Sequence, residues 1–288
     1  MLKFVVCMKQ VPMVSELPWD NRTGTLKRDL AQGMMDPGSR YALEAALQLK
    51  AKLVKAKLGA GKVSIIGVSM GPPMAEEVLY EARALGVDTG FLLSDPAMAG
   101  ADTFITTQVL AAFIKQVCPD VDLVFCGVQS ADSETAQVGP QLAEELDIPA
   151  VAYARSLTIT EDMLRVERQV DDYSEILEMQ LPGLVSIDST QERFTPRYVP
   201  LDGVEMAFES NDVHCLGVQD LELADGFNAL VQSPTRIMDV YSPTTEKQNH
   251  VLKGAVKRSV DTLFDQYGKL ISGAMGKDLK THEHGGGE

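Results

Sequence analysis

The chain has 288 residues, of which 23% are charged and 45% hydrophobic, and its formal net charge is −15. This length allows one large domain or two small ones with a substantial buried core. The acidic excess argues against nucleic acid and anionic membranes as partners, because both bind through a basic face. A nucleotide ligand is still compatible with this charge, since backbone N–H groups can hold phosphate.

The cysteines and the apolar run at the N-terminus indicate the cellular compartment of the protein. Cys7, Cys118, Cys126 and Cys215 are scattered and include no CxxC pair, so we expect buried free thiols in a reducing compartment. The apolar run 2–7 is too short for a signal peptide or a membrane span, and no later run reaches spanning length. The sequence therefore predicts a cytoplasmic protein.

The first half of the chain alternates apolar runs with helical patterns. Short, continuous apolar runs predict buried strands at 3–8, 62–70, 90–94 and 121–126. Apolar residues at helical spacing predict helices at 36–57, 74–85, 101–117 and 137–146. Residues 9–36 are expected to be mostly loop, and a hairpin around 21–25 is one interpretation of their turn residues. The alternation predicts an α/β fold with a mostly parallel, doubly wound, Rossmann-like sheet covered on both faces.

After Pro149 the pattern changes to short β-like runs with polar breaks. These runs predict antiparallel strands appended to the parallel sheet, at 153–160, 163–170, 174–181 and 184–188. Residues 211–233 show no clear regular structure, and 251–271 predict an amphipathic helix. We therefore expect an α/β domain over 1–210, a C-terminal arm over 211–279 and a disordered tail over 280–288.

One loop has the composition of a phosphate site. Residues 127–140 follow a predicted strand, lead into a predicted helix and include two Gly, two Ser and one Thr. Free N–H groups and the helix dipole at such a helix start attract an anion. The loop contains no Lys or Arg, so its amides and the side chains of Ser130, Ser133, Thr135 and Gln137 would hold the anion. An ordinary strand–helix connection with capping residues is the alternative interpretation.

The position of Pro140 and the ends of the strands support a ligand site. Pro fits poorly in a helix interior, so a helix starting near Gln137 would leave Thr135 and Ala136 in the loop, facing a ligand. Parallel sheets bind ligands outside the carboxyl ends of their strands. We call the edge of the sheet formed by these carboxyl ends the rim. The segments that should gather along it are 8–12, 69–73 and 127–140.

Catalytic and metal-binding patterns do not emerge from the sequence. It contains no GxSxG elbow, P-loop or HExxH motif, and no GxGxxG follows the first strand. We interpret Asp171-Asp172 as a solvated turn, and His282 and His284 as part of a solvated tail rather than as metal ligands. A nucleotide-binding chain without acid–base machinery is either a carrier whose cofactor does the chemistry or a nucleotide-sensing partner.

Six segments resemble, in order, the beta (small) subunit of electron-transfer flavoproteins. They include Cys7-Met8-Lys9-Gln10-Val11-Pro12, Asp36-Pro37 with the helix entry that follows, and the loop from Gly127 to Pro140. The other three are 68–72, 84–88 and 166–182. Each segment alone is weak, but the ordered set is highly specific.

The resemblance implies an adenine-nucleotide-binding α/β domain in a heterodimer, with a C-terminal arm that clasps a larger, FAD-carrying alpha subunit. It also implies a second nucleotide, held by this chain. The residues implied to contact it are Cys7, Asp36, Pro37, Gly38, Ser39, Met70, Gly127, Gln129, Ser130, Ala131, Asp132, Thr135, Ala136, Gln137 and Val138.

The identity of that nucleotide separates two forms of the family. Residues 135–140 and 233–236 resemble the electron-bifurcating form, in which FAD takes hydride from NADH. It then sends electrons towards the alpha-subunit FAD and its dehydrogenase, and towards a low-potential acceptor such as ferredoxin or flavodoxin. The alternatives are a structural AMP in a non-bifurcating subunit and a non-redox nucleotide sensor of the same architecture.

Two departures from the family pattern bear on contacts and partners. Val128 stands where many members have Lys, which removes one charge contact. The segment 189–198 corresponds to the loop at which members dock to a flavin dehydrogenase, but it is longer than in the family. The resemblance therefore predicts a docked flavin dehydrogenase there and leaves its identity open.

Overall fold

A computed structural model provides the structure of the protein and describes most of the chain. The described residues are 1–13, 19–20, 25–26, 33–56, 63–160, 163–190, 192–235 and 251–275. The chain divides into two compact units, Met1–Arg236 and Ile237–Glu288.

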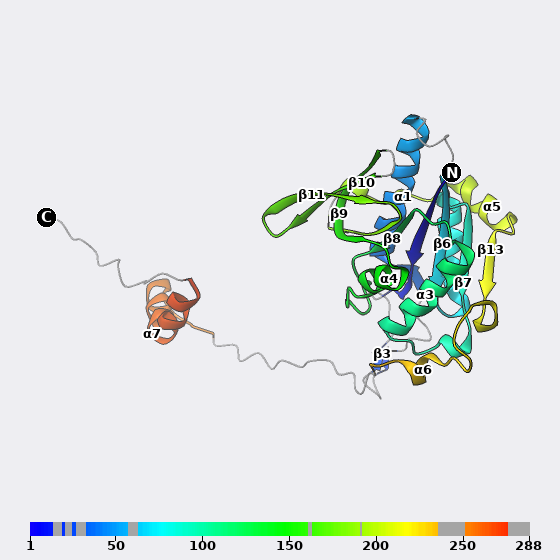
Figure 1. Cartoon of the computed structure of the whole chain (residues 1–288). Helices are drawn as coiled ribbons and strands as arrows, with labels where there is room; N and C mark the ends of the chain where they lie inside the picture. The colour runs from blue at the N-terminus through cyan, green and yellow to red at the C-terminus, as the bar shows by residue number, and fades with distance from the viewer. Residues whose placement is uncertain are drawn as a thin grey trace. The chain divides into compact units, whose positions relative to one another are not determined.

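The first unit is built on a nine-stranded sheet, with strand order β11-β10-β9-β12-β8-β1-β6-β7-β13 (Figure 1). The strands are β1 (Leu2–Met8), β6 (Val63–Met70), β7 (Thr89–Leu93), β8 (Leu123–Gly127), β9 (Ala150–Thr160), β10 (Met163–Val170), β11 (Tyr173–Gln180), β12 (Gly183–Ile187) and β13 (Val213–Leu216). All neighbouring pairs from β9 to β13 are parallel, whereas β10 is antiparallel to both β9 and β11. The predicted α/β fold with a mostly parallel sheet is confirmed.

Helices cover both faces of this sheet, as expected from continuous apolar strands. The helices are α1 (Pro37–Ala56), α2 (Glu76–Leu85), α3 (Thr103–Val117) and α4 (Val138–Leu146). One buried cluster joins Phe4 and Val6 of β1 to residues of α1 and α2, and the other joins Val5 to α3 and α4. Alternate residues of β1 therefore enter two separate cores, which explains why the strand is apolar throughout.

The order in which successive strands are added to the sheet reverses at β1. β6 and β7 lie on one side of β1, and the chain then returns to place β8 on the other side, with Val6 opposite Phe125. Helix α1 contacts both β1 and β8. Such a switch point leaves a crevice outside the carboxyl ends of its two strands, where ligands bind in open α/β sheets.

The antiparallel extension is confirmed only in part. β9, β10 and β11 form antiparallel pairs, and Asp171 lies at the β10–β11 turn with φ 53°. In Figure 1 the β10–β11 hairpin projects away from the rest of the sheet. The prediction for 184–188 is wrong, because β12 is parallel to both β8 and β9 and all five of its residues are buried.

The prediction of no regular structure over 211–233 is also wrong. β13 pairs in parallel with β7 at the edge of the main sheet, and α6 (Ala229–Gln232) follows it. The first compact unit therefore continues to Arg236 rather than ending at 210. The four residues of β13 have no strong β pattern of their own and depend on β7 for their hydrogen bonds.

Smaller elements complete the first unit. They are the strand pairs β2 (Gln10–Pro12) with β5 (Gly33–Met35) and β3 (Trp19–Asp20) with β4 (Thr25–Leu26), helix α5 (Leu201–Glu209), and 3₁₀ helices at Pro73–Ala75, Pro96–Met98, Glu192–Phe194 and Val218–Asp220. The antiparallel β3–β4 pair agrees with the hairpin expected around 21–25, whose turn 21–24 lies outside the described residues.

The second unit contains helix α7 (Val256–Met275), which begins later than the predicted 251. Val256, Val260, Leu263 and Phe264 are all exposed on this helix. Apolar side chains at this spacing form a stripe along one side of the helix. The tail 280–288 lies outside the described residues. Among the helices of the described residues, none has the length and apolar character needed to cross a bilayer.

Candidate functional site

The loop after β8 and the start of α1 approach each other at two glycines. A Cβ on Gly38 would lie 2.7 Å from the carbonyl oxygen of Gln129, and a Cβ on Gly127 would lie 2.7 Å from the carbonyl carbon of Gly38. Both distances are shorter than ordinary Cβ contacts, so this approach of two backbones requires glycine on both sides. The two predicted site segments therefore meet at the switch point between β1 and β8.

Asp36 connects these segments through its buried carboxylate. Its Oδ2 accepts a hydrogen bond from the N–H of Ser39 at 2.9 Å, which caps the first turn of α1. Its Oδ1 accepts one from the N–H of Ala131 at 2.8 Å, and the side chain is almost fully enclosed. The main contribution of Asp36 is thus to hold the loop against the helix, with both oxygens already used by the protein.

The end of β1 is tied to the same place. The N–H of Lys9 donates to Ser39 Oγ at 3.1 Å, and the N–H of Asp36 donates to the carbonyl of Lys9 at 2.9 Å. Backbone and side-chain bonds therefore join three segments that are distant in sequence. This network fixes the backbone at the rim.

The side chain of Lys9 crosses the rim to the loop. Its Nζ lies 2.7 Å from Asp132 Oδ1 and 3.3 Å from Ser130 Oγ, and Ser130 Oγ also donates to Asp132 Oδ1 at 2.7 Å. Partial burial acts to raise the pKa of Asp132, but the hydrogen bonds from Lys9 and Ser130 outweigh it and the pKa is lowered. Lys9 was missed as a site residue, although its place directly after β1 was a usable signal.

The start of α4 has the predicted form. The helix begins at Val138 with Gln137 as its N-cap residue, so Pro140 lies in the first turn, where no backbone hydrogen bond is lost. The N–H groups of Val138 and Gly139 have no partner within the helix. Ala136, with φ 55°, lies in the left-handed region just before them. Thr135 and Ala136 remain in the loop, as expected.

Polar side chains differ in how freely they could contact a ligand. Thr103 donates its hydroxyl to Gln137 Oε1 at 2.8 Å, so Gln137 is partly occupied by α3. Thr135 and Gln129 are exposed, and Ser130 is half-buried beside Asp132. The loop therefore offers hydroxyls and amides rather than a rigid set of charged groups.

Cys7 and Met70 lie at the ends of neighbouring strands on the same rim. Cys7 is opposite Val68 in the register of β1 and β6, and Met70 ends β6 in a half-buried position. Burial raises the pKa of the Cys7 thiol well above its ordinary value, and the nearby Cys126 adds to the shift. Cys7 is therefore a neutral thiol at physiological pH and not a nucleophile.

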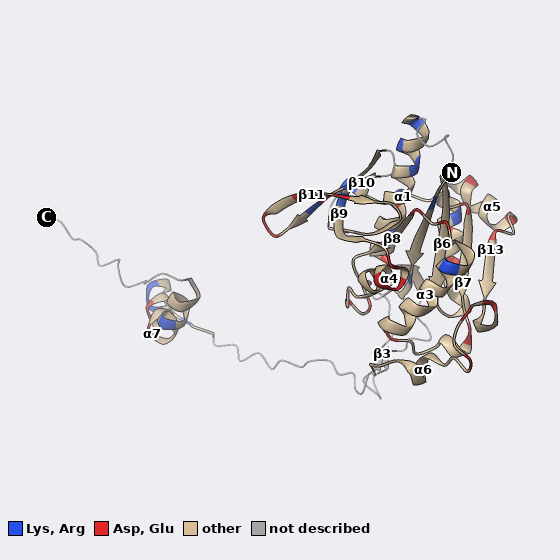
Figure 2. Cartoon of the chain, in the orientation of Figure 1, with Lys and Arg blue, Asp and Glu red and all other residues tan. Residues whose placement is uncertain are grey.

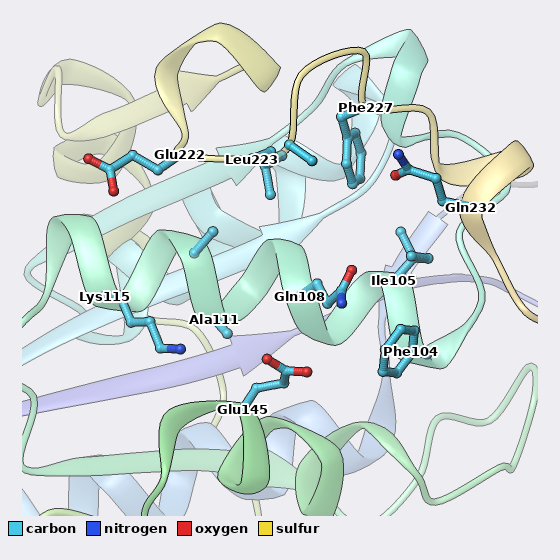
Figure 3. Close-up of a pocket in the computed structure, with 12 residues that line it drawn as sticks. Phe104, Ile105, Gln108, Ala111, Lys115, Glu145, Glu222, Leu223, Phe227 and Gln232 are labelled. Atoms are coloured by element: carbon cyan, nitrogen blue, oxygen red, sulfur yellow. The ribbon is translucent and has the colours of Figure 1, made fainter.

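A groove of 480 Å³ lies away from this rim, along the outer side of α3 (Figure 3). Phe104, Leu223 and Phe227 contribute apolar surface to it, and Lys115 and Glu145 lie at its charged side (Figure 3). None of the residues implied to contact the nucleotide lines this groove. The groove and the rim are therefore separate features of the first unit.

Comparison with known proteins finds similarity to electron transfer flavoproteins. The family model described as "Electron transfer flavoprotein domain" matches residues 23–203. The electron transfer flavoprotein subunit beta of Thermoanaerobacterium thermosaccharolyticum is 38% identical over 265 residues, which cover 92% of this chain and 97% of the relative.

Two further relatives have different names. The caffeyl-CoA reductase-Etf complex subunit CarD of Acetobacterium woodii is 36% identical over 271 residues, covering 94% of this chain and 97% of the relative. Protein FixA of Azotobacter vinelandii is 32% identical over 284 residues, covering 92% and 96%. Together with the fold and the family model, these similarities show that the chain belongs to the beta subunit family of the electron transfer flavoproteins.

Proposed function

We propose that this chain is the nucleotide-binding subunit of a cytoplasmic heterodimeric electron-transfer flavoprotein and holds FAD at the rim between β1 and β8. The observation that carries the proposal is the junction of α1 and the 127–138 loop at the switch point, fixed by Asp36. The proposed contact residues are Cys7, Asp36 to Ser39, Met70, Gly127, Gln129 to Asp132 and Thr135 to Val138.

The hydrogen-bond donors of the rim support an adenine nucleotide as the proposed ligand. The N–H groups of Val138 and Gly139 begin a helix and face no helical partner, which favours a phosphate group. The glycine contact between Gly38 and Gly127 keeps side chains out of the junction. Ser130 and Thr135 add hydroxyls that can bond phosphate or ribose oxygens.

The residues of the rim bind and orient rather than transfer protons. When bound, FAD would supply the redox chemistry, with NADH as the proposed hydride donor and the alpha-subunit FAD and a ferredoxin or flavodoxin as the proposed electron acceptors. The neutral, buried thiol of Cys7 would not attack a bound cofactor. Amide donors around the phosphates would hold the cofactor in one position, which electron transfer between two sites requires.

The alpha subunit is proposed as the permanent partner. Helix α7 exposes Val256, Val260 and Leu263 along one side, and such a stripe fits an arm that is buried against another protein. The proposed arm begins after Arg236 and extends to residue 279. It does not begin at 211, because β13 and α6 belong to the first unit.

A flavin dehydrogenase is proposed to dock at the segment 189–198. Phe194 is buried in the core, and Arg197 forms two hydrogen bonds to Glu44 of α1, at 2.7 and 2.9 Å. The next residue, Tyr198, is 97% exposed. An anchored segment that presents an aromatic side chain is suited to protein recognition. The relative CarD is named as a subunit of a caffeyl-CoA reductase complex, which favours an acyl-CoA-reducing dehydrogenase.

A structural AMP in place of FAD is the second candidate. The amides and hydroxyls of the loop would hold a monophosphate as well as a diphosphate, so this alternative rests on the same residues. The non-redox sensor has less support, because family membership associates the chain with electron transfer.

Cofactor content distinguishes these proposals. The chain should be co-expressed with its alpha subunit, and the purified complex extracted with acid and analysed by chromatography. Two FAD and no AMP per heterodimer is the expected result, with NADH oxidation as the second readout. One FAD with one AMP would replace the bifurcating function by a structural nucleotide, and a chain that carries no nucleotide would overturn both.

A further inference from the structure

Lys9 stands out among the rim residues, because neither the sequence pattern nor the family comparison gave it a role. Its backbone is fixed on both sides, by Ser39 Oγ and by the N–H of Asp36. Its side chain is 43% exposed and reaches across the crevice to Asp132. Lys9 therefore combines a backbone that is fixed at the end of β1 with a partly exposed, charged side chain.

The negative charge of the loop favours a cationic side chain beside a bound phosphate, in addition to the backbone amides. The loop carries the carboxylates of Asp132 and Glu134, and neither the loop nor α4 contains a Lys or Arg (Figure 2). A phosphate dianion near these carboxylates is repelled by about 1 kcal/mol per unit-charge pair at 4 Å in water, and by several-fold more at a partly buried site. Within the described residues, Lys9 is the one basic side chain that is hydrogen-bonded or ion-paired to residues 127–138.

The existing ion pair can be exchanged at low cost. The Asp132 side chain is 31% exposed, and a solvent-accessible pair of this kind contributes little net stability. If Lys9 leaves, Asp132 keeps the hydroxyl of Ser130 as a hydrogen-bond donor at 2.7 Å. The loop would thus keep its internal bonds while the ammonium group turned towards a bound anion.

We propose that Lys9 is the phosphate-neutralising residue of the rim and that its ion pair with Asp132 is the resting arrangement that a nucleotide phosphate replaces. The inference rests on the proposed nucleotide site, and it makes the site selective for the charge of the ligand. Binding of a phosphorylated nucleotide would release Asp132, whereas adenosine would leave the Lys9–Asp132 pair intact.

The test compares AMP with adenosine on the nucleotide-depleted full-length chain in complex with its alpha subunit, by calorimetric titration. Lys9→Met should lower AMP affinity about tenfold to a hundredfold, the usual range for losing a charge-assisted hydrogen bond. Adenosine affinity should change by less than about twofold, because it carries no charge. Lys9→Arg should restore AMP binding, and Asp132→Asn should increase it several-fold by removing the competing carboxylate.

A matched control is Lys115→Met, which removes a lysine from the groove along α3 and should change neither affinity. An equal loss of AMP and adenosine binding in Lys9→Met would make Lys9 a structural residue and overturn the inference, as would unchanged AMP binding. Should Lys9→Met fail to fold, an unchanged AMP affinity in Asp132→Asn would also overturn it. A wild-type complex that binds no adenine nucleotide or FAD would instead overturn the proposed function itself, and the inference with it.

Discussion

Two loops that are both anchored on α1 differ in what they leave exposed. The 127–137 loop is held by the buried carboxylate of Asp36, through backbone N–H groups, at the first turn of the helix. The 192–198 segment is held two turns later by the ion pair between Glu44 and Arg197 and by the buried ring of Phe194. One helix therefore positions both the proposed nucleotide site and the proposed docking site.

The difference lies in the surface that each loop presents. Around the first loop the exposed groups are hydroxyls, amides and carboxylates, with glycine contacts that bring two backbones together. After the second anchor, Tyr198 and Leu201 are 97% and 90% exposed. Fixed polar donors suit a small anionic ligand, whereas a large exposed apolar surface suits a protein partner. The same scaffold thus supports two kinds of recognition through different chemistry.

Among the changes that test this comparison, removal of the Asp36 carboxylate should cause the largest loss of stability. Asp36→Ala would leave the N–H of Ser39 and the N–H of Ala131 without their acceptor, and we expect a loss of about 2–4 kcal/mol in unfolding free energy. Denaturant unfolding measures the change. Asp36→Asn, which keeps an acceptor oxygen, is the matched control and should lose less. Unchanged stability in Asp36→Ala would show that the carboxylate oxygens do not hold the loop.

A methyl group at the glycine junction should be the next most disruptive change. In Gly127→Ala the new Cβ would meet the backbone of Gly38, and overpacking of this kind costs about 1–3 kcal/mol. AMP or FAD binding should weaken as well, because the loop must move away from α1. Gly273→Ala in α7, where no atom lies within 4 Å of the new Cβ, should be neutral or slightly stabilising. Unchanged nucleotide binding in Gly127→Ala would show that the contact between Gly38 and Gly127 is not needed for the nucleotide site.

Breaking the second anchor should affect docking without affecting the nucleotide. Arg197→Met would leave Glu44, whose side chain is only 6% exposed, without its cation. We expect a loss of about 1–2 kcal/mol, moderated because the amide of Gln48 still donates to Glu44. AMP affinity should remain within twofold of the wild type, and electron delivery to the dehydrogenase should fall. A large loss of AMP binding would show that the two loops are coupled through α1.

The smallest effect concerns acid stability, at Asp132 in the first loop and at Asp188, which precedes the second. The pKa values of Asp132 and Asp188 are lowered although burial opposes this, because Lys9 and Ser130 donate to the former, and Thr190 and Arg155 to the latter. A lowered folded-state pKa contributes stability that is present above the unfolded value of about 3.9 and is lost as the pH falls through the folded value.

Asp132→Asn and Asp188→Asn should each flatten the decline of stability below about pH 4. Unfolding free energies measured between pH 2 and 7 would show this, with the larger change expected for Asp188, whose side chain is only 7% exposed. A decline in either variant as steep as in the wild type would mean that the carboxylate does not contribute to acid stability.

Much of the fold could be predicted because the signals are local. Continuous apolar runs identified β1, β6, β7 and β8, and the helical spacing between them identified α1 to α4. The position of Pro140 predicted the start of α4 correctly. The errors came from strands whose identity depends on their neighbours: β12 is inserted in parallel between β8 and β9, and β13 is completed by β7.

The chemistry of the rim was less accessible from sequence. Asp36 could be recognised as a helix cap, but its bond to Ala131 joins residues 95 positions apart. The pair of Lys9 and Asp132 spans 123 positions. No spacing rule connects such residues, because the contact exists only after β8 has taken its place beside β1.

The sequence by itself determined the alternation of strands and helices, the amide-rich loop before α4 and the motifs of the electron transfer flavoprotein family. These features depend on composition and spacing within short windows, which the chain carries before it folds. Only the tertiary structure decided that β8 lies beside β1, that α1 anchors two loops and that Lys9 faces Asp132. Strand order and side-chain partnership arise from packing between distant segments, where burial of apolar surface selects one arrangement among many compatible with the same local pattern.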